Sequence, residues 1–319
     1  MNFKKLLSMV VVAGMMLTGC QSSSNEVEQT QGSVAEEIST ATMTNEEKEQ
    51  VEVEEKVTEE VKVVAATVSA TQVLAELNAE VLGVPVTSQT LPEVYADLPT
   101  VGQAMNPDLE VVASLEPDLL IMDANFKASV EDSLDSYGIN AFFFETGSYE
   151  AFTNSIEELG KAINREEEAA SLVSEIKEAE KVVALNRTET SPTVAVIFGA
   201  GDNFMLATES SYLGDLVKTV GATNITSTLE GDMSSAYVQF SLEQILAANP
   251  DYVLRFAHGN IEETSKMFNE AFDKNEAYQE LDAVKNGKVY DLDSSIFNVS
   301  ANLEIKTAIT TLGDIFYGN

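Results

Sequence analysis

Two distant segments of the chain share one pattern in one register. Residues 108–121 read DLEVVASLEPDLLI, and residues 241–254 read SLEQILAANPDYVL. Each begins with a residue that can cap a helix, continues through Leu-Glu into two apolar turns, and ends with Pro-Asp and a strand. Pro-Asp alone is ordinary turn chemistry. The identical register, in which Glu110 matches Glu243, predicts two similar lobes.

A long amphipathic segment, Asn164 to Asn186, lies between these copies. Its apolar residues recur at intervals of three and four, as in one face of a helix; they are Ala169, Leu172, Val173, Ile176, Ala179, Val182 and Val183. Asn164 is the expected cap, with Glu167 three residues later. At 1.5 Å per residue the helix would span roughly 30–35 Å. It could be a surface helix of one domain, but the flanking repeats favour a bridge between lobes.

Short helical and β-branched segments alternate on both sides of this helix. The expected strands before it are 61–67, 81–84, 119–122 and 141–144, and those after it are 193–198, 204–207, 251–256 and 288–292. Expected helices lie at 71–79, 108–115, 128–137, 149–163, 212–220, 242–248, within 262–281 and at 301–316. Such alternation is typical of α/β proteins. We therefore predict two similar lobes with central, mainly parallel sheets, joined by one long rigid helix.

The first 60 residues have a different character. Residues 1–20 carry two lysines, an apolar run and Leu-Thr-Gly-Cys, the features of an export signal that ends at Cys20. Residues 21–60 contain twelve glutamates, two lysines and no aromatic residue, which predicts a solvated acidic tether. The expected divisions are therefore a signal at 1–20, a tether at 21–60, an N-terminal lobe at 61–163, a bridging helix at 164–190 and a C-terminal lobe at 191–319.

The charge of the chain excludes some partners. It has 53 acidic and 18 basic residues, for a formal net charge of −35. Nucleic acid and anionic lipid are therefore not expected as main partners. Cys20 is the only cysteine, so no internal disulfide is possible.

One histidine and one methionine are candidate metal ligands. His258, the only histidine, follows an expected strand, and ligands of open α/β sheets gather at the carboxyl ends of strands. A single histidine excludes multi-histidine zinc sites. Met105 lies in the turn-rich passage 91–107, where a methionine more often fills a packing gap than binds a metal. A methionine and a histidine together can hold haem iron axially.

The arrangement resembles the substrate-binding proteins of iron-chelate and cobalamin ABC importers, in which one long helix joins two α/β lobes. The resemblance covers residues from about 60 to the end and implies that Glu110 and Glu243 dock on arginines of the permease. As first-turn carboxylates, both also stabilise helix starts, and the two roles are compatible.

Shorter motifs are similar to those of the haem-binding lipoproteins of Gram-positive haem uptake. These are Thr90-Leu-Pro with Tyr95, Val101-Gly-Gln-x-Met105, Ala207-Thr-Glu-x-Ser-Tyr212, Arg255-x-Ala-His258 and Val289-Tyr-Asp-Leu292. This resemblance implies a monomer anchored through lipid on Cys20 at the outer face of the cell membrane. It would take haem b from a cell-surface donor protein, hold the iron with Met105 and His258, and deliver it to an ABC permease and its ATPase.

The remaining expectations concern the pocket and the alternatives. Tyr95, Tyr212 and Tyr237 are candidate pocket walls, although each suits a core equally well. No basic residue is clearly placed for the haem propionates, so backbone N–H groups near 106–108 or 210–212 are the candidates. The alternatives are a siderophore or corrinoid ligand on the same fold, and a surface interaction protein with an empty cleft. An enzyme is not expected, because six-coordinate iron leaves no open position.

Overall fold

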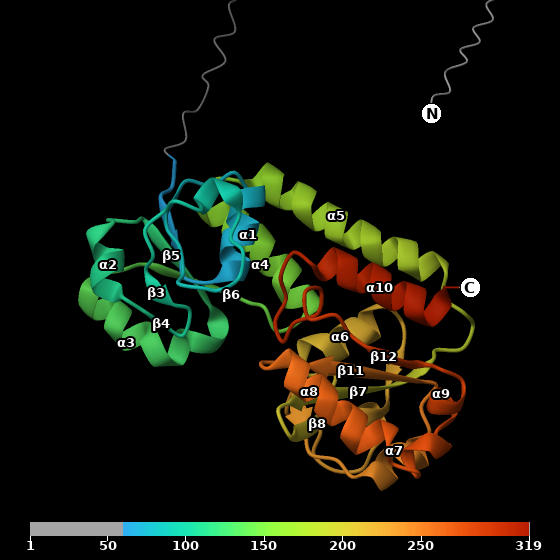
Figure 1. Ribbon diagram of the computed structural model, residues 1–319. Helices are drawn as coiled ribbons and strands as arrows, with labels where there is room; N and C mark the ends of the chain where they lie inside the picture. The colour runs from blue at the N-terminus through green and yellow to red at the C-terminus, as the bar shows by residue number, and fades with distance from the viewer. Residues whose placement is uncertain (1–59, 319) are drawn as a thin grey trace, which may run out of the picture. The chain divides into compact units, whose positions relative to one another are not determined.

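The computed structural model of the chain describes residues 60–318 (Figure 1). The predicted export signal, Cys20 and all of the predicted tether except Glu60 therefore lie outside the described residues. Within residues 60–318, no helix is both long enough and apolar enough to cross a membrane.

The first lobe is built on a four-stranded sheet in which all neighbouring strands run parallel, in the order β2-β1-β5-β6. The strands are β1 (Val63–Ala65), β2 (Val81–Gly83), β5 (Leu119–Asp123) and β6 (Ala141–Phe144). The helices are α1 (Val68–Glu76), α2 (Leu109–Ser114), α3 (Lys127–Tyr137) and α4 (Tyr149–Ala162). A short antiparallel ribbon, β3 (Gly102–Gln103) with β4 (Asn106–Pro107), interrupts the predicted loop.

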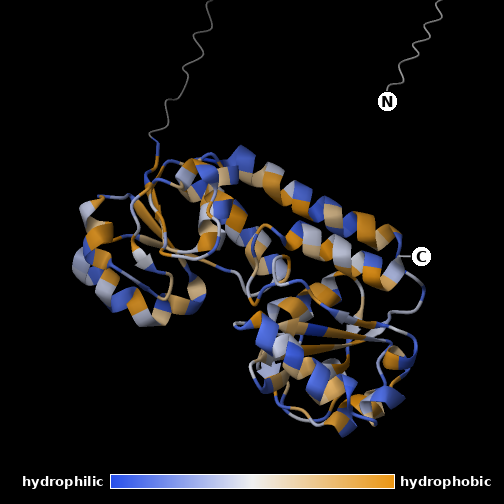
Figure 2. Cartoon of the chain, in the orientation of Figure 1, coloured by the Kyte–Doolittle hydropathy of each residue, from blue (hydrophilic) through white to orange (hydrophobic). Residues whose placement is uncertain are grey.

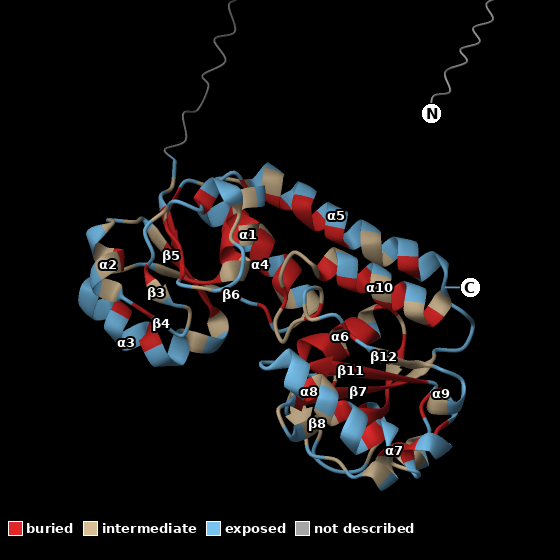
Figure 3. Cartoon of the chain, in the orientation of Figure 1, coloured by how far each residue is buried: buried red, intermediate tan, exposed pale blue. Residues whose placement is uncertain are grey.

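Both faces of this sheet are buried. Val63 and Ile121 belong to a large apolar cluster on one face, whereas Val64, Leu120 and Met122 belong to a second cluster on the other. Successive side chains of a strand point to opposite faces, so a strand covered on both sides must be apolar throughout. This explains why these strands are continuous apolar runs, seen as hydrophobic in Figure 2 and buried in Figure 3.

The second lobe has a mixed sheet in the order β10-β8-β7-β11-β12, with β9 also paired to β7. The strands are β7 (Thr193–Ala200), β8 (Asn203–Ala207), β9 (Thr223–Asn224), β10 (Tyr237–Val238), β11 (Tyr252–Ala257) and β12 (Val289–Asp291). Strands β9, β7, β11 and β12 are parallel, while β7-β8 and β8-β10 are antiparallel. Gly201, with φ +63°, makes the tight turn from β7 to β8.

The helices of this lobe are α6 (Tyr212–Thr219), α7 (Leu242–Ala248), α8 (Ile261–Phe268), α9 (Asp282–Lys285) and α10 (Ile305–Tyr317). A π-helical turn (Asn269–Asp273) follows α8, and 3₁₀ turns occur in both lobes at 93–95, 124–126, 225–227 and 278–280. Sequence analysis did not predict the short strands β9 and β10.

The internal repeat has a structural counterpart in both lobes. Helix α2 starts at Leu109 and α7 at Leu242, and the strands that follow start at the matching positions Leu119 and Tyr252. Strand β5 lies between β1 and β6, and β11 lies between β7 and β12. The two copies therefore build the same interior part of two sheets, which confirms the prediction of two similar lobes.

The long helix is α5 (Glu166–Leu185), which packs against α4 of the first lobe and α10 of the second (Figure 1). Two glycines allow this close packing. A side chain at Gly160 of α4 would collide with Ala169, and one at Gly313 of α10 would lie 2.5 Å from Cγ2 of Val183. One α5 face is therefore fixed to both lobes.

The predicted ends of α5 need correction. Asn164 is not the cap, because it adopts a left-handed conformation (φ 57°) and Arg165 is the N-cap, without a side-chain cap bond. The backbone N–H of Arg165 donates to Gly160 O at 2.7 Å, which turns the chain tightly from α4 into α5. Three glutamates in the first turn suit the positive helix end instead. Val182 is also 46% exposed and does not belong to the buried stripe.

Polar contacts tie the two lobes together beside α5. The Tyr149 N–H, at the start of α4, donates to Asp215 Oδ2 of α6 at 2.7 Å. The Ala301 N–H, in the segment before α10, donates to Thr146 O at 2.8 Å. Helix α10 begins at Ile305 and not at the predicted Ala301, because the chain first makes a turn in which the Ile305 N–H donates to Asn302 O and the Glu304 N–H donates to Asn302 Oδ1.

Candidate functional site

Three adjoining cavities, which we call the cleft, lie between residues of the first and second lobes. Their volumes are about 680, 190 and 290 Å³. The cavities of about 680 and 190 Å³ share Gln72, Gln89, His258, Asn298 and Asn302. The cavities of about 290 and 190 Å³ share Val68, Ser69, Gln89 and Ser300. Pockets for small ligands commonly measure about 300–1,000 Å³, so the cleft can hold a ligand of that size.

His258 lies on the second-lobe wall, directly after the carboxyl end of β11. Its backbone N–H donates to Gly199 O at 2.9 Å, which extends the pairing of β11 with β7 by one residue. Its exposed ring lines the two cavities of about 680 and 190 Å³. The rings of Phe198 and Phe256 lie 5.9 and 6.3 Å from it. The imidazole is thus open to the cleft and supported by aromatic neighbours.

Met105 lies in the turn between β3 and β4, on the first lobe. Gly102 begins this ribbon with φ +93°, and a side chain there would lie 2.8 Å from Asp108 N, so only glycine suits the position. The Met105 side chain is 69% exposed. It therefore does not fill a gap in the core, which was the alternative explanation for a loop methionine. Its neighbour Ala104 lines the cavity of about 290 Å³.

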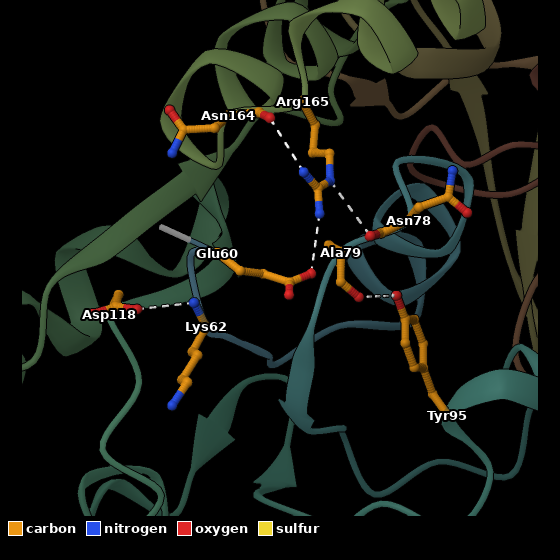
Figure 4. Close-up of polar contacts among 8 residues, drawn as sticks. All are labelled: Glu60, Lys62, Asn78, Ala79, Tyr95, Asp118, Asn164 and Arg165. Carbon is orange, nitrogen blue, oxygen red and sulfur yellow. Dashed lines mark hydrogen bonds and ion pairs between the residues drawn. The ribbon is translucent and has the colours of Figure 1, made fainter. Parts of the chain in front are cut away.

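The three tyrosines occupy different surroundings. Tyr95 is buried, and its hydroxyl donates to Ala79 O at 3.0 Å (Figure 4); burial raises its pKa to about 12. Tyr212 is buried in the first turn of α6, and burial raises its pKa. None of the three tyrosines is among the residues that line the cleft. Tyr237 is half-buried, with its ring 4.4 Å from Phe198, the ring that also lies beside His258.

Besides apolar side chains and His258, the cleft is lined by uncharged polar groups and two carboxylates. None of the described residues that line it is Lys or Arg. Buried Asp123 accepts a hydrogen bond from the Thr146 hydroxyl at 2.6 Å and one from Asn125 N at 2.9 Å, so its carboxylate is already occupied. Glu304 is the second carboxylate. Among residues 60–318, no group of three or more His, Cys, Asp or Glu side chains is arranged to hold a metal ion.

All three arginines have partners outside the cleft. Arg255 is buried and forms ion pairs at 2.6 Å with Asp291 and with Asp273. Arg165 pairs with Glu60 at 3.0 Å and donates to Asn78 O, as Figure 4 shows. Arg187 donates to Thr219 O at the end of α6.

The helix starts proposed for the propionates are already capped. The Asp108 N–H donates to Val101 O, and its carboxylate accepts from the N–H groups of Glu110 and Val111. The N–H groups of Ser210 and Ser211 both donate to Thr208. These groups are therefore not available to anchor a ligand, and that expectation is wrong for them.

The two repeat glutamates are exposed in the first turns of α2 and α7. Ser241 caps α7 in a capping box with Gln244. Hydrogen bonds from its own backbone N–H and from Ser241 hold the pKa of Glu243 below its usual value. Within the part of the chain that the structure describes, neither Glu110 nor Glu243 forms an ion pair.

Sequence analysis missed the amide side chains of the cleft, above all Gln72 on α1. Its Oε1 is buried and has no hydrogen-bond partner among the described residues, and the residue lines two cavities together with His258. A glutamine inside a helical segment is usually a solvated surface residue. No local signal distinguishes it, since its position depends on how the two lobes meet.

Residues 63–296 match the periplasmic binding protein family. The high-affinity heme uptake system protein IsdE of Staphylococcus aureus (strain MRSA252) is 30% identical over 319 residues, covering 99% of both chains. An ABC transporter substrate-binding protein from Listeria monocytogenes EGD-e has 34% identity and a TM-score of 0.71, over 82% of this chain and 100% of its own. The structure of S. aureus IsdE complexed with heme has 32% identity and a TM-score of 0.68, over 81% and 99%.

Proposed function

The chain belongs to the periplasmic binding protein family, and we propose that, within this family, it binds haem in the cleft between its lobes. Membership makes it the substrate-binding protein of an ABC transporter and not an enzyme. Haem is the ligand that IsdE is named for, and the relationship to IsdE extends over the whole chain. The fold with two α/β lobes and one bridging helix is the same in both.

The observation that carries this proposal is the placement of His258. The only histidine of the chain projects from the carboxyl end of a central strand into a cleft lined by both lobes. A neutral imidazole binds haem iron through one ring nitrogen, and a methionine sulfur on the opposite side completes the six ligands. We assign Met105 this second role because its side chain is exposed on the first lobe and its sequence neighbour Ala104 lines the cavity of about 290 Å³. Both ligands are uncharged, so no extra charge is buried with the iron.

The cleft walls suit a flat apolar ligand. Phe256, Ile261 and Phe297 line the largest cavity, and Val86 and Phe126 line the cavity on the first lobe. We retain Tyr237 as a wall candidate, because its ring lies 4.4 Å from that of Phe198, which in turn lies beside His258. Tyr95 and Tyr212 instead stabilise the cores of their lobes.

The remaining parts of the proposal concern delivery. Glu110 and Glu243 present one exposed carboxylate on each lobe, and we propose that they pair with arginines of the permease, which acts with its ATPase. Lipid on Cys20 would hold the protein at the outer face of the membrane, with residues 21–60 as the tether. A monomer at this site would receive haem from a cell-surface donor protein.

A hemin titration followed by visible absorption tests the ligand. We expect a shifted Soret band with the spectrum of six-coordinate iron, and a changed spectrum for His258→Ala and for Met105→Leu, which keeps apolar volume but removes the sulfur. Met233→Ala, at a loop methionine of the second lobe, is the control and should match the unmodified protein. An unshifted Soret band, or identical spectra for all variants, would refute the assignment.

A ferric siderophore or a corrinoid remains the rival ligand. Anionic ferric chelates are usually held by basic side chains, and no described residue lining the cleft is Lys or Arg. Calorimetry with ferric chelates separates the two possibilities, since heat of binding from a chelate but not from hemin would select the rival.

A further inference from the structure

The uncharged polar lining of the cleft consists of hydroxyl and carboxamide side chains from both lobes, and the carboxamides are its larger hydrogen-bonding groups. Gln72 and Gln89 come from the first lobe, and Asn298 and Asn302 from the segment before α10. The Oδ1 atom of Asn302 accepts from the Glu304 N–H at 2.9 Å, which leaves its NH₂ group for the cleft. A carboxamide offers two N–H donors and one carbonyl acceptor and carries no charge.

This lining is poorly suited to an ionised carboxylate. Burying a carboxylate without a cation is costly, and the described lining contains Asp123 and Glu304 but no Lys or Arg. The chain as a whole carries a formal charge of −35, which adds repulsion at longer range. A ligand held here by charge would need a cation that the lining does not supply.

Gln72 gives the clearest sign of what the lining can bind. Its Oε1 is buried without a donor while the residue faces two cavities of the cleft. An unpaired buried acceptor is costly, so a ligand that satisfies it, or that lets the amide turn its NH₂ group inward, gains affinity. Turning exchanges the two ends of the amide at little cost, because they have nearly the same shape. A carboxamide N–H can therefore donate a hydrogen bond to the carbonyl oxygen of an ester or an acid as well as to a carboxylate oxygen.

We propose that the cleft holds the polar edge of its porphyrin through neutral carboxamides, with Gln72 as the contact on the first lobe, and that ionised propionates are not required. This inference rests on the proposed binding of haem. It extends the ligand class to iron porphyrins whose side chains are uncharged, such as esters. Affinity then comes from iron ligation and apolar contact, and the amides orient the ring.

The test compares hemin with iron protoporphyrin IX dimethyl ester in Soret titrations of the same protein. We expect the dimethyl ester to bind at least as tightly as hemin, to within about threefold, because the lining supplies no cation to an ionised propionate and an amide N–H can donate to an ester carbonyl instead. A loss of about thirtyfold or more for the ester would overturn the inference and leave haem binding intact. Failure of both porphyrins to bind would instead refute the proposed function.

A cation introduced at the amide supplies the complementary test. Gln72→Lys should favour hemin over the ester by about tenfold relative to the unmodified protein, because a cation near a carboxylate gains roughly this much in a partly solvated site. Glu76→Gln, at an exposed site later on α1, raises the net charge equally and should leave the ratio unchanged. An unchanged ratio in Gln72→Lys would remove Gln72 from the polar edge. If that variant does not fold, Gln89→Lys, on an exposed loop, provides the same comparison.

Discussion

The close packing of α5 on α10 can be tested at Gly313. An added methyl group there would lie 2.5 Å from Cγ2 and 3.0 Å from Cγ1 of Val183, whereas favourable carbon contacts lie near 3.5–4.0 Å. Overpacking of this kind typically costs about 1–3 kcal/mol. Replacing glycine by alanine within a helix gains about 1 kcal/mol. Gly313→Ala should therefore lower the free energy of unfolding by about 1 kcal/mol, against the direction of helix propensity.

A double-mutant cycle isolates the contact. Val183→Ala removes two buried methyl groups, at about 0.8 kcal/mol each, and adds a cavity term. In the double variant the new methyl of residue 313 fills part of that space, so the combined loss should fall short of the sum by about 1–2 kcal/mol. Urea unfolding followed by far-ultraviolet circular dichroism provides the free energies. Ala184→Gly, at an exposed position of α5, measures the propensity term alone.

Two results would refute this reasoning. If Gly313→Ala were more stable than the unmodified protein by the propensity gain, the helices would not be in close contact at this point. If the two substitutions were simply additive, the loss would not arise between residues 313 and 183. In either case α5 would be less firmly fixed to the second lobe than the glycine geometry indicates.

Three further predictions concern charge. Burial, followed by repulsion from Glu150 and Glu209, raises the pKa of Asp215 above 3.8 even though the Tyr149 N–H and nearby Lys218 lower it. The folded protein therefore holds this proton more tightly than the unfolded chain, and the free energy of unfolding rises as pH falls through the raised pKa. In urea unfolding, the difference in free energy of unfolding between Asp215→Asn and the unmodified protein should shrink over this pH range. A constant difference would contradict this. Hemin association, measured by stopped-flow, should become faster with added salt, since screening weakens the repulsion between anionic hemin and the acidic protein. Slower association with added salt would instead indicate that hemin enters past basic side chains. Glu110→Ala with Glu243→Ala should keep hemin affinity and abolish uptake by cells, so normal uptake would remove both residues from docking.

Sequence reasoning succeeded where local pattern and global fold agree. The repeat predicted the starts of matching helices and strands because capping and apolar periodicity act within a few residues, and Asp108 and Ser241 do cap their helices. Strand β6 and helix α7 have the predicted bounds for the same reason. The position of His258 at the carboxyl end of β11 also followed, since it depends only on the order of elements.

It failed where tertiary contacts outweigh local preference. Asn164 is a good capping residue by type, but the tight turn from α4 to α5 places it in a left-handed conformation one position too early. Helix α10 starts late because a turn closed by the Glu304 N–H bond to Asn302 Oδ1 comes before it. Tyr95 and Tyr212 are of a residue type that suits a pocket wall, but they lie in the core. No sequence periodicity distinguishes a tyrosine in a pocket wall from one in the core.

The fixed relation between the lobes bears on how weak polar contacts can suffice in the cleft. Helix α5 packs on both lobes, and the bonds from Tyr149 to Asp215 and from Ala301 to Thr146 connect them again on the side of α4 and α10. Binding costs less conformational entropy when the walls of the cleft are already fixed in position. Neutral amides, each contributing only about 1 kcal/mol per hydrogen bond, can then orient a ligand whose iron we propose is held by Met105 and His258. A hinged cleft would need stronger charged contacts to offset closure, and the described lining offers no cation for them.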